Sequence, residues 1–161
     1  MTSTASEIET AAAAKPRQVY QLFIKATPER VWEGITSEDF TARYFHHTRV
    51  RSDLTPGSPL LYYSEDGADV LVEGEVIECD PPRRLMVSWH MLYDPALKVD
   101  PPSRVTWELE GAADGLTKLT VIHDGFDRET ATYTHTAGGW MWILSNLKTL
   151  LETGDTLPSV G

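Results

Sequence analysis

The sequence predicts an α+β fold in which a curved antiparallel β-sheet of about seven strands is wrapped around one long C-terminal α-helix. Three observations lead to this prediction. Apolar residues recur at helical spacing in residues 138–153, whereas between residues 47 and 124 they alternate along short segments separated by turns. Two helix-capping signals follow the first predicted strand in close succession, which indicates two short helices between that strand and the rest of the sheet.

The predicted long helix, Gly138–Thr153, is the element around which the rest is organised. At roughly 100° per residue its apolar side chains occupy one stripe about 120° wide, typical of a helix with one buried face. Gly154 suits the position after the helix, and Pro158 prevents the helix from resuming. Trp142 lies off this stripe and is expected to cover a loop or to mark a partner surface. The stripe consists of Trp140, Ile143, Leu144, Leu147, Leu150 and Leu151.

The first strand is predicted at Gln18–Ala26, where apolar and polar residues alternate between two faces. Thr27 then has the character of an N-cap, with Pro28 at the first helical position. Ser37 is a second N-cap, followed at once by Glu38, whose negative charge suits a helix N-terminus. A strand followed by two short helices in tandem is therefore expected.

The middle of the chain predicts six further strands joined mainly by short turns, a pattern that implies antiparallel pairing. Tyr93–Ser103 contains three prolines and is expected to be a long loop, and Gly111–Gly115 a turn. A single helix of about 30 Å covers such a sheet without filling it, so a cavity is expected between helix and sheet. The strands are expected at residues 47–53, 60–64, 70–79, 84–91, 104–110 and 117–124.

Length and composition predict one domain at residues 17–153, between an Ala-rich disordered tail at 1–16 and a short C-terminal tail at 154–161. With 14 basic against 24 acidic residues the net charge is −10, which argues against a nucleic-acid partner. The sequence has neither an apolar run long enough to span a membrane nor a secretory signal pattern, and Cys79 is its only cysteine. A cytoplasmic protein without a membrane span is therefore expected.

Several segments resemble a known family. The opening VYQLFIKATPERVWEGITSEDFTARYF resembles the start of START-like (SRPBCC, helix-grip) domains. GEVIECDPPRRLMVSWH, RVTWELE, LTKLTVIHDGF and GGWMWILSNLKTLLE resemble, in the same order, the bacterial homologues of the activator of the heat-shock protein 90 ATPase. The resemblance covers about Gln18–Glu152 and implies the helix-grip fold. Members of this superfamily include ligand carriers, cyclase-like enzymes and co-chaperone domains, so the resemblance leaves the function open.

No motif in the sequence predicts catalysis, a metal site or a cofactor. The histidines show no metal-binding spacing, and neither a GxSxG elbow nor a P-loop is present. Glu73 and Glu75 share one face of a strand, which is expected to be the solvated face because Val72 and Val76 point the other way. The five histidines are His46, His47, His90, His123 and His135.

The leading hypothesis is a non-catalytic carrier or sensor that binds a small hydrophobic or amphipathic molecule in the helix–sheet cavity. One alternative is a cyclase- or hydrolase-like enzyme acting on a hydrophobic substrate, with His90 or His123 as its acid or base. Another is a stress-related module that binds a chaperone, as the family resemblance implies, and a homodimer is a further partner hypothesis. The candidate ligand-binding residues are Trp107, His123, Trp89, Tyr62, His90 and Trp140.

Overall fold

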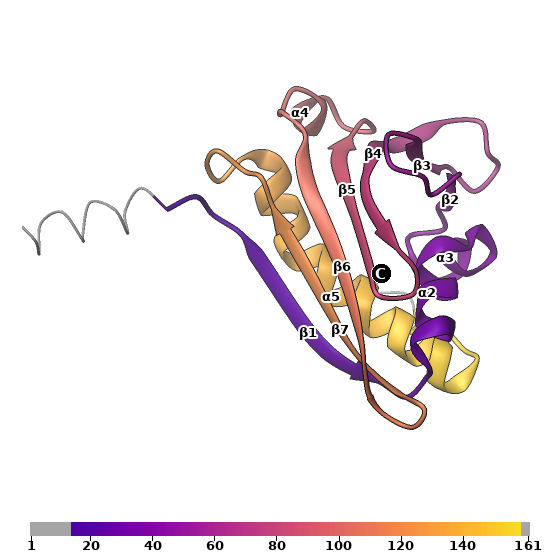
Figure 1. Cartoon of the computed structure of the whole chain (residues 1–161). Helices are drawn as coiled ribbons and strands as arrows, with labels where there is room; N and C mark the ends of the chain where they lie inside the picture. Colours follow the sequence, from indigo (N-terminus) through magenta and orange to yellow (C-terminus); the bar gives the residue numbers. More distant parts are fainter. Residues whose placement is uncertain (1–13, 159–161) are drawn as a thin grey trace, which may run out of the picture.

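A seven-stranded antiparallel sheet with a long helix packed across one face forms the protein in a computed structural model that describes residues 14–158 (Figure 1). The strand order is β1-β7-β6-β5-β4-β3-β2, and every neighbouring pair is antiparallel. This confirms the predicted fold class. The strands are β1 (Gln18–Ile24), β2 (Arg49–Ser52), β3 (Pro59–Tyr63), β4 (Val70–Asp80), β5 (Arg84–Met91), β6 (Ser103–Ala113) and β7 (Leu116–Asp124), and the helices are α2 (Pro28–Thr36), α3 (Glu38–Tyr44), α4 (Pro95–Lys98) and α5 (Ala131–Thr153).

The two short helices carry the chain from one edge of the sheet to the other. β1 and β2 are the edge strands, and α2 and α3 lie between them in the chain (Figure 1). The Thr27 hydroxyl caps α2 by accepting a hydrogen bond from Arg30 N at 3.2 Å. Ser37 is the N-cap residue of α3, although its side chain makes no capping hydrogen bond. Both helices therefore begin where the sequence predicts.

Helix α5 begins at Ala131, seven residues before the predicted start at Gly138. The prediction followed the apolar stripe, whereas the first turns of α5 are held by polar contacts. Thr130 is the N-cap and accepts from Tyr133 N at 3.1 Å, and Thr132 is buried. The Asp100 carboxylate accepts from both the backbone N–H and the hydroxyl of Thr132, each at 2.8 Å. The C-terminal end agrees with the prediction, because Gly154 follows the helix with φ 85°.

Two loop predictions are wrong in detail. The expected loop Tyr93–Ser103 contains the short helix α4, whose N-cap Asp94 accepts from Ala96 N at 2.9 Å. The expected turn at Gly111–Gly115 is shorter, because β6 continues through a register shift to Ala113 and pairs with β7 there. In both places a local cap or bulge extends regular structure into a Pro- or Gly-containing segment.

The core lies between α5 and the sheet face that it covers. Five of the six predicted stripe residues are fully buried, and Leu151 is partly buried. Asn146, off the stripe, is also buried, because its side chain donates to Tyr44 O at 3.3 Å and accepts from Leu157 N at 2.8 Å. The C-terminal segment thus folds back against α5, whereas residues 1–13 and 159–161 of the predicted tails lie outside the described residues.

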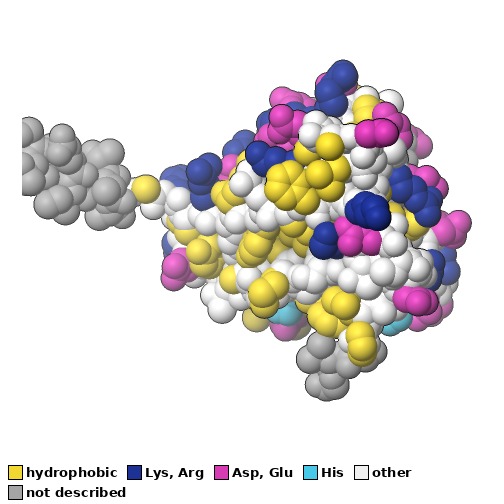
Figure 2. All heavy atoms as spheres, turned by 90° about the horizontal axis from the view of Figure 1, so that it is seen from below, with side chains coloured by type: hydrophobic (Ala, Val, Ile, Leu, Met, Phe, Trp, Pro, Cys, Tyr) yellow, Lys and Arg dark blue, Asp and Glu magenta, His cyan; other side chains and the backbone are white. Residues whose placement is uncertain are grey.

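The surface seen from below carries intermixed acidic and basic side chains around scattered apolar ones (Figure 2). Within residues 14–158, no helix is both long and apolar enough to cross a membrane.

Candidate ligand cavity

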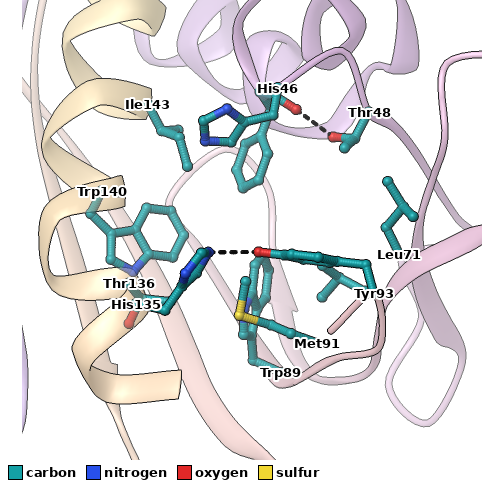
Figure 3. A pocket seen from close by; sticks show the side chains of 13 residues that line it. His46, Thr48, Leu71, Trp89, Met91, Tyr93, His135, Thr136, Trp140 and Ile143 are labelled. Carbon is teal, nitrogen blue, oxygen red and sulfur yellow. Dashed lines mark hydrogen bonds between the residues drawn. The ribbon is translucent and has the colours of Figure 1, made fainter. Parts of the chain in front are cut away.

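A cavity of about 370 Å³ lies between the N-terminal half of α5 and the strands β4 and β5 (Figure 3). The turn between α3 and β2 and the segment after β5 also contribute lining residues. The side chains on β5 that line it alternate with outward-facing ones, as expected for a strand with one buried face. The lining residues are Phe45, His46, Thr48, Leu71, Val72, Trp89, Met91, Tyr93, His135, Thr136, Gly139, Trp140 and Ile143.

An aromatic cluster forms the inner wall. The Phe45 ring stacks on Tyr62 with a centroid separation of 4.8 Å and meets Trp140 edge-on at 6.0 Å. Trp89 contacts Tyr62 at 5.2 Å and Trp140 at 5.7 Å. Each ring packs against several others, which restricts the motion of the side chains in this wall.

The polar groups of the cavity lie mainly near its rim. Tyr93 Oη and His135 Nε2 are 2.7 Å apart and join the segment after β5 to α5, as the dashed line in Figure 3 shows. His46 and Thr48 lie on another side of the cavity (Figure 3). Trp89, deeper in the wall, has a buried indole N–H that finds no hydrogen-bond partner within residues 14–158. Such a donor is costly unless an acceptor reaches it.

A buried hydrogen-bond chain supports this wall from behind. Trp140 Nε1 donates to His123 Nδ1 at 3.0 Å, so the other ring nitrogen of His123 carries the proton. His123 Nε2 then donates to Ser103 Oγ at 2.7 Å, and Ser103 Oγ donates to Trp89 O at 3.3 Å. Burial lowers the pKa of His123 from 6.5 to about 3, against a small opposing effect of Asp124. The imidazole is therefore neutral and fully hydrogen-bonded.

Comparison with known proteins identifies the family. The family model described as "Activator of Hsp90 ATPase homolog 1-like protein" matches residues 25–152. The chain belongs to this family. The resemblance found in the sequence motifs is thereby confirmed over nearly the same span. No curated protein matches the chain.

Solved structures of the same fold include DynU16, a protein from the dynemicin biosynthetic locus. It is 26% identical with a TM-score of 0.71, and the alignment covers 89% of this chain but 49% of DynU16. Protein MLL2253 from Mesorhizobium loti is 24% identical with a TM-score of 0.70, covering 87% of this chain and 99% of that one. An HSP90 activator from Plasmodium falciparum is 19% identical with a TM-score of 0.68, covering 84% and 96%. The last two likenesses show the helix-grip fold alone.

In this member of the Hsp90-activator homologue family, two of the six predicted ligand-binding residues, Trp89 and Trp140, line the cavity. Tyr62 lies behind Phe45, and Trp107 is fully buried against Trp140, with centroids 5.4 Å apart. A role of these side chains in ligand binding stays a prediction.

The two predicted histidines lie elsewhere. His123 belongs to the buried chain behind the wall, and both its ring nitrogens are engaged. His90 points to the opposite face of β5, where its ring nitrogens lie 3.1 Å from Glu73 Oε1 and 2.8 Å from Lys98 O. His90 and Trp89 are adjacent on β5, so their side chains point to opposite faces of the sheet. Neither position brings an imidazole to the cavity wall.

The sequence reasoning missed the lining residues that come from connections and from the first turns of α5, chiefly Phe45, His46, Tyr93, His135 and Gly139. The adjacent pair His46 and His47, directly after a short helix, was a sequence signal that could have pointed to this side of the cavity. Trp142 is partly buried against the core, and the neighbouring Met141, 67% exposed, takes the outward position on α5. Within the described residues, no group of three or more His, Cys, Asp or Glu is placed to hold a metal ion.

Proposed function

We propose that this protein binds a small, largely apolar molecule in the cavity between α5 and the sheet, and that it acts as a non-catalytic carrier or sensor. The observation that supports the proposal is the cavity of about 370 Å³, whose wall is built from aromatic and aliphatic side chains with a few polar groups at the rim. Ligand sites in proteins commonly have this composition, with volumes of about 300–1,000 Å³.

Burial of apolar surface would drive binding. At about 25 cal/mol per Å², a ligand that buries about 300 Å² of apolar surface gains about 7.5 kcal/mol before the cost of its lost freedom. Phe45 stacks on Tyr62, and Trp89 meets Tyr62 edge-on, so the wall is held in place and little ordering is needed on binding.

The protonation state of His123 favours a carrier over an enzyme. A general acid or base works best with a pKa near the operating pH. The pKa of His123 is about 3, and both of its nitrogens are hydrogen-bonded inside the protein. Tyr93 and His135 are the remaining pair that an enzyme hypothesis would use.

Two adjacent glycines of α5 provide the decisive test. A Cβ at Gly138 or Gly139 has no atom of a neighbouring element within 4 Å, but only Gly139 lines the cavity. Gly139→Leu should therefore place a side chain inside the cavity, whereas Gly138→Leu should place one on the exposed side of the same helix. Both changes replace a helical glycine and should leave stability equal or higher.

Binding is measured with N-phenylnaphthylamine, an uncharged fluorophore whose emission rises in apolar surroundings. We expect the wild type and Gly138→Leu to bind it equally and Gly139→Leu to bind at least about tenfold more weakly, the change that 1.4 kcal/mol of lost contact produces. Equal binding by all three proteins, or binding by none, would contradict the cavity as the site.

Mass spectrometry of a ligand retained from cell extract, before and after incubation, distinguishes a carrier from an enzyme. An unchanged ligand supports a carrier, and a new product supports an enzyme.

Family membership favours a second candidate, a module that binds a heat-shock protein 90 chaperone. The test is whether the chain changes the ATPase rate of that chaperone. If it does so with the same strength in Gly139→Leu, the chaperone activity does not need the cavity.

A further inference from the structure

Beside the apolar cavity lies a second, polar hollow of about 300 Å³. His46 lines both spaces and so stands at the boundary between them. Arg43, on the last turn of α3, and His47 line the polar hollow, together with Trp142 and Asn146 of α5 and the C-terminal segment. Arg43 is positioned there by a hydrogen bond of 2.8 Å from its guanidinium to Gly154 O.

The residues that line the cavity and the polar hollow differ in charge from the chain as a whole. The chain carries 24 acidic residues and a net charge of −10, yet no Asp or Glu among residues 14–158 lines the cavity or the polar hollow. Three of the five histidines and one arginine line them instead. Asp39 and Glu65 line a neighbouring hollow, which shares Arg43, His47 and Thr156 with the polar hollow but does not include His46. The boundary at His46 is thus lined by hydrogen-bond donors, and the guanidinium of Arg43 lies beside it, in an otherwise acidic protein.

The backbone that presents the two histidines is strained. His46 and His47 both have positive φ, 51° and 57°, in a turn closed by the hydrogen bonds of Thr48 N and Thr48 Oγ1 to Phe45 O at 3.0 and 2.6 Å. Turns with positive φ at both central positions strongly favour Asn and Gly, because a Cβ is disfavoured there. Retained strain of this kind is concentrated at ligand sites.

We propose that the cavity takes an amphipathic ligand with an anionic group, in the simplest case a carboxylate, and that His46 and Arg43 hold this group at the boundary with the polar hollow. The inference rests on the proposed function, because the apolar body of the ligand occupies the cavity already described. A ligand that fills the cavity has its polar end within reach of His46, and the Arg43 guanidinium supplies the charge-assisted hydrogen bonds that carboxylates prefer.

The test compares two ligands that share one apolar chain, decanoate and decanol, as competitors that displace N-phenylnaphthylamine. We expect the wild type to bind decanoate at least about tenfold more tightly than decanol. The ratio of the two affinities cancels the contribution of the apolar chain and reports the anionic group alone.

Three variants assign that ratio to residues. His46→Gly and Arg43→Gln should each lower the preference for decanoate at least about threefold, while the affinity for decanol changes little. Arg83→Gln, which removes the same charge from the exposed turn between β4 and β5, should keep the wild-type ratio. Because glycine tolerates positive φ, His46→Gly should melt at the wild-type temperature or above it, so weaker decanoate binding cannot be attributed to unfolding.

A wild-type ratio near one, or an unchanged ratio in His46→Gly and Arg43→Gln, overturns the inference. If the fluorophore still binds and Gly139→Leu still blocks it, the cavity function stands and only the anionic ligand class fails. If the fluorophore does not bind at all, both proposals fail.

Discussion

At the scale of single residues, His123 shows how burial determines chemistry. The same imidazole that would be half-protonated near pH 6.5 in an open chain is fully enclosed here, 0% exposed, between Trp140 and Ser103. Its hydrogen bonds join α5 to β6 and β7, so its neutral form is part of the fold. This makes the stability of the protein sensitive to mildly acidic pH.

The sign of that dependence follows from proton uptake. The unfolded chain binds a proton at His123 near pH 6.5, whereas the folded protein binds it only near the pKa of about 3. Between these values the unfolded state holds more protons, so the free energy of unfolding falls as pH falls, by about 1.4 kcal/mol per pH unit. His46, whose pKa burial also lowers, acts in the same direction.

His123→Gln should remove the contribution of His123 to the pH dependence of the free energy of unfolding. Glutamine can still accept a hydrogen bond from Trp140 and donate one to Ser103, but it does not titrate. Urea melts at about pH 6 and about pH 5, where most carboxylates are ionised in both states, measure the difference. We expect the wild type to lose about 1.2 kcal/mol more than the variant over this interval, because His123 in the unfolded chain is already mostly protonated at pH 6. Parallel pH profiles would show that His123 does not remain neutral in the fold.

At the scale of elements, α5 is held in place both by its apolar stripe and by hydrogen bonds from polar groups. Its C-terminal part packs through Ile143, Leu144, Leu147 and Leu150, whereas its first turn is held by Asp100 from the segment before β6. Lys148 donates to Phe23 O near the end of the edge strand β1, and Glu152 accepts from Lys25 N just after that strand, each at 2.7 Å. These contacts occupy backbone groups at an otherwise unpaired edge, which would discourage pairing with another chain.

Asp100→Ala should destabilise the protein by about 1–3 kcal/mol, because it leaves the buried backbone N–H and hydroxyl of Thr132 without their acceptor. Asp100→Asn keeps an acceptor oxygen but loses the negative charge at the N-terminus of α5, so its loss should be smaller. Urea melts of both variants provide the measurement. Equal losses would mean that charge, and not hydrogen bonding, dominates this contact.

At the scale of the whole molecule, one long helix covers a face of a wide sheet (Figure 1). The cavity lies between the N-terminal half of α5 and strands β4 and β5 (Figure 3). A ligand that occupies this space binds only the folded protein. Its binding free energy is therefore added to the free energy of unfolding.

Saturation with a cavity ligand should raise the melting temperature. At a free concentration one hundred times its Kd, a ligand stabilises the fold by about 2.7 kcal/mol, which for a domain of this size is a shift of several degrees. Differential scanning calorimetry of the wild type and Gly138→Leu with decanoate should show the shift, and Gly139→Leu should not. A shift that persists in Gly139→Leu would place the ligand outside the cavity.

Local patterns in the sequence were sufficient for most of the fold. The alternation Leu85, Val87, Trp89 predicted β5 and its buried face, and Thr27 with Pro28 predicted the start of α2. Such signals act between residues one to four positions apart and need no knowledge of distant contacts. The start of α5 could not be predicted from such local signals, because Thr132 is held by hydrogen bonds to Asp100, which lies far away in the chain.

The candidate site was determined mainly by tertiary structure. Motif resemblance in the sequence predicted the family, and apolar periodicity and helix caps, which are local properties, predicted the helix–sheet architecture. Of the predicted ligand-binding residues, Trp89 and Trp140 line the cavity. Which polar groups meet the cavity depends on contacts between distant segments: Tyr93 reaches His135 only after β5 and α5 have packed. The same packing encloses His123, whose sequence position alone suggested a ligand anchor, and leaves His46 at the cavity rim.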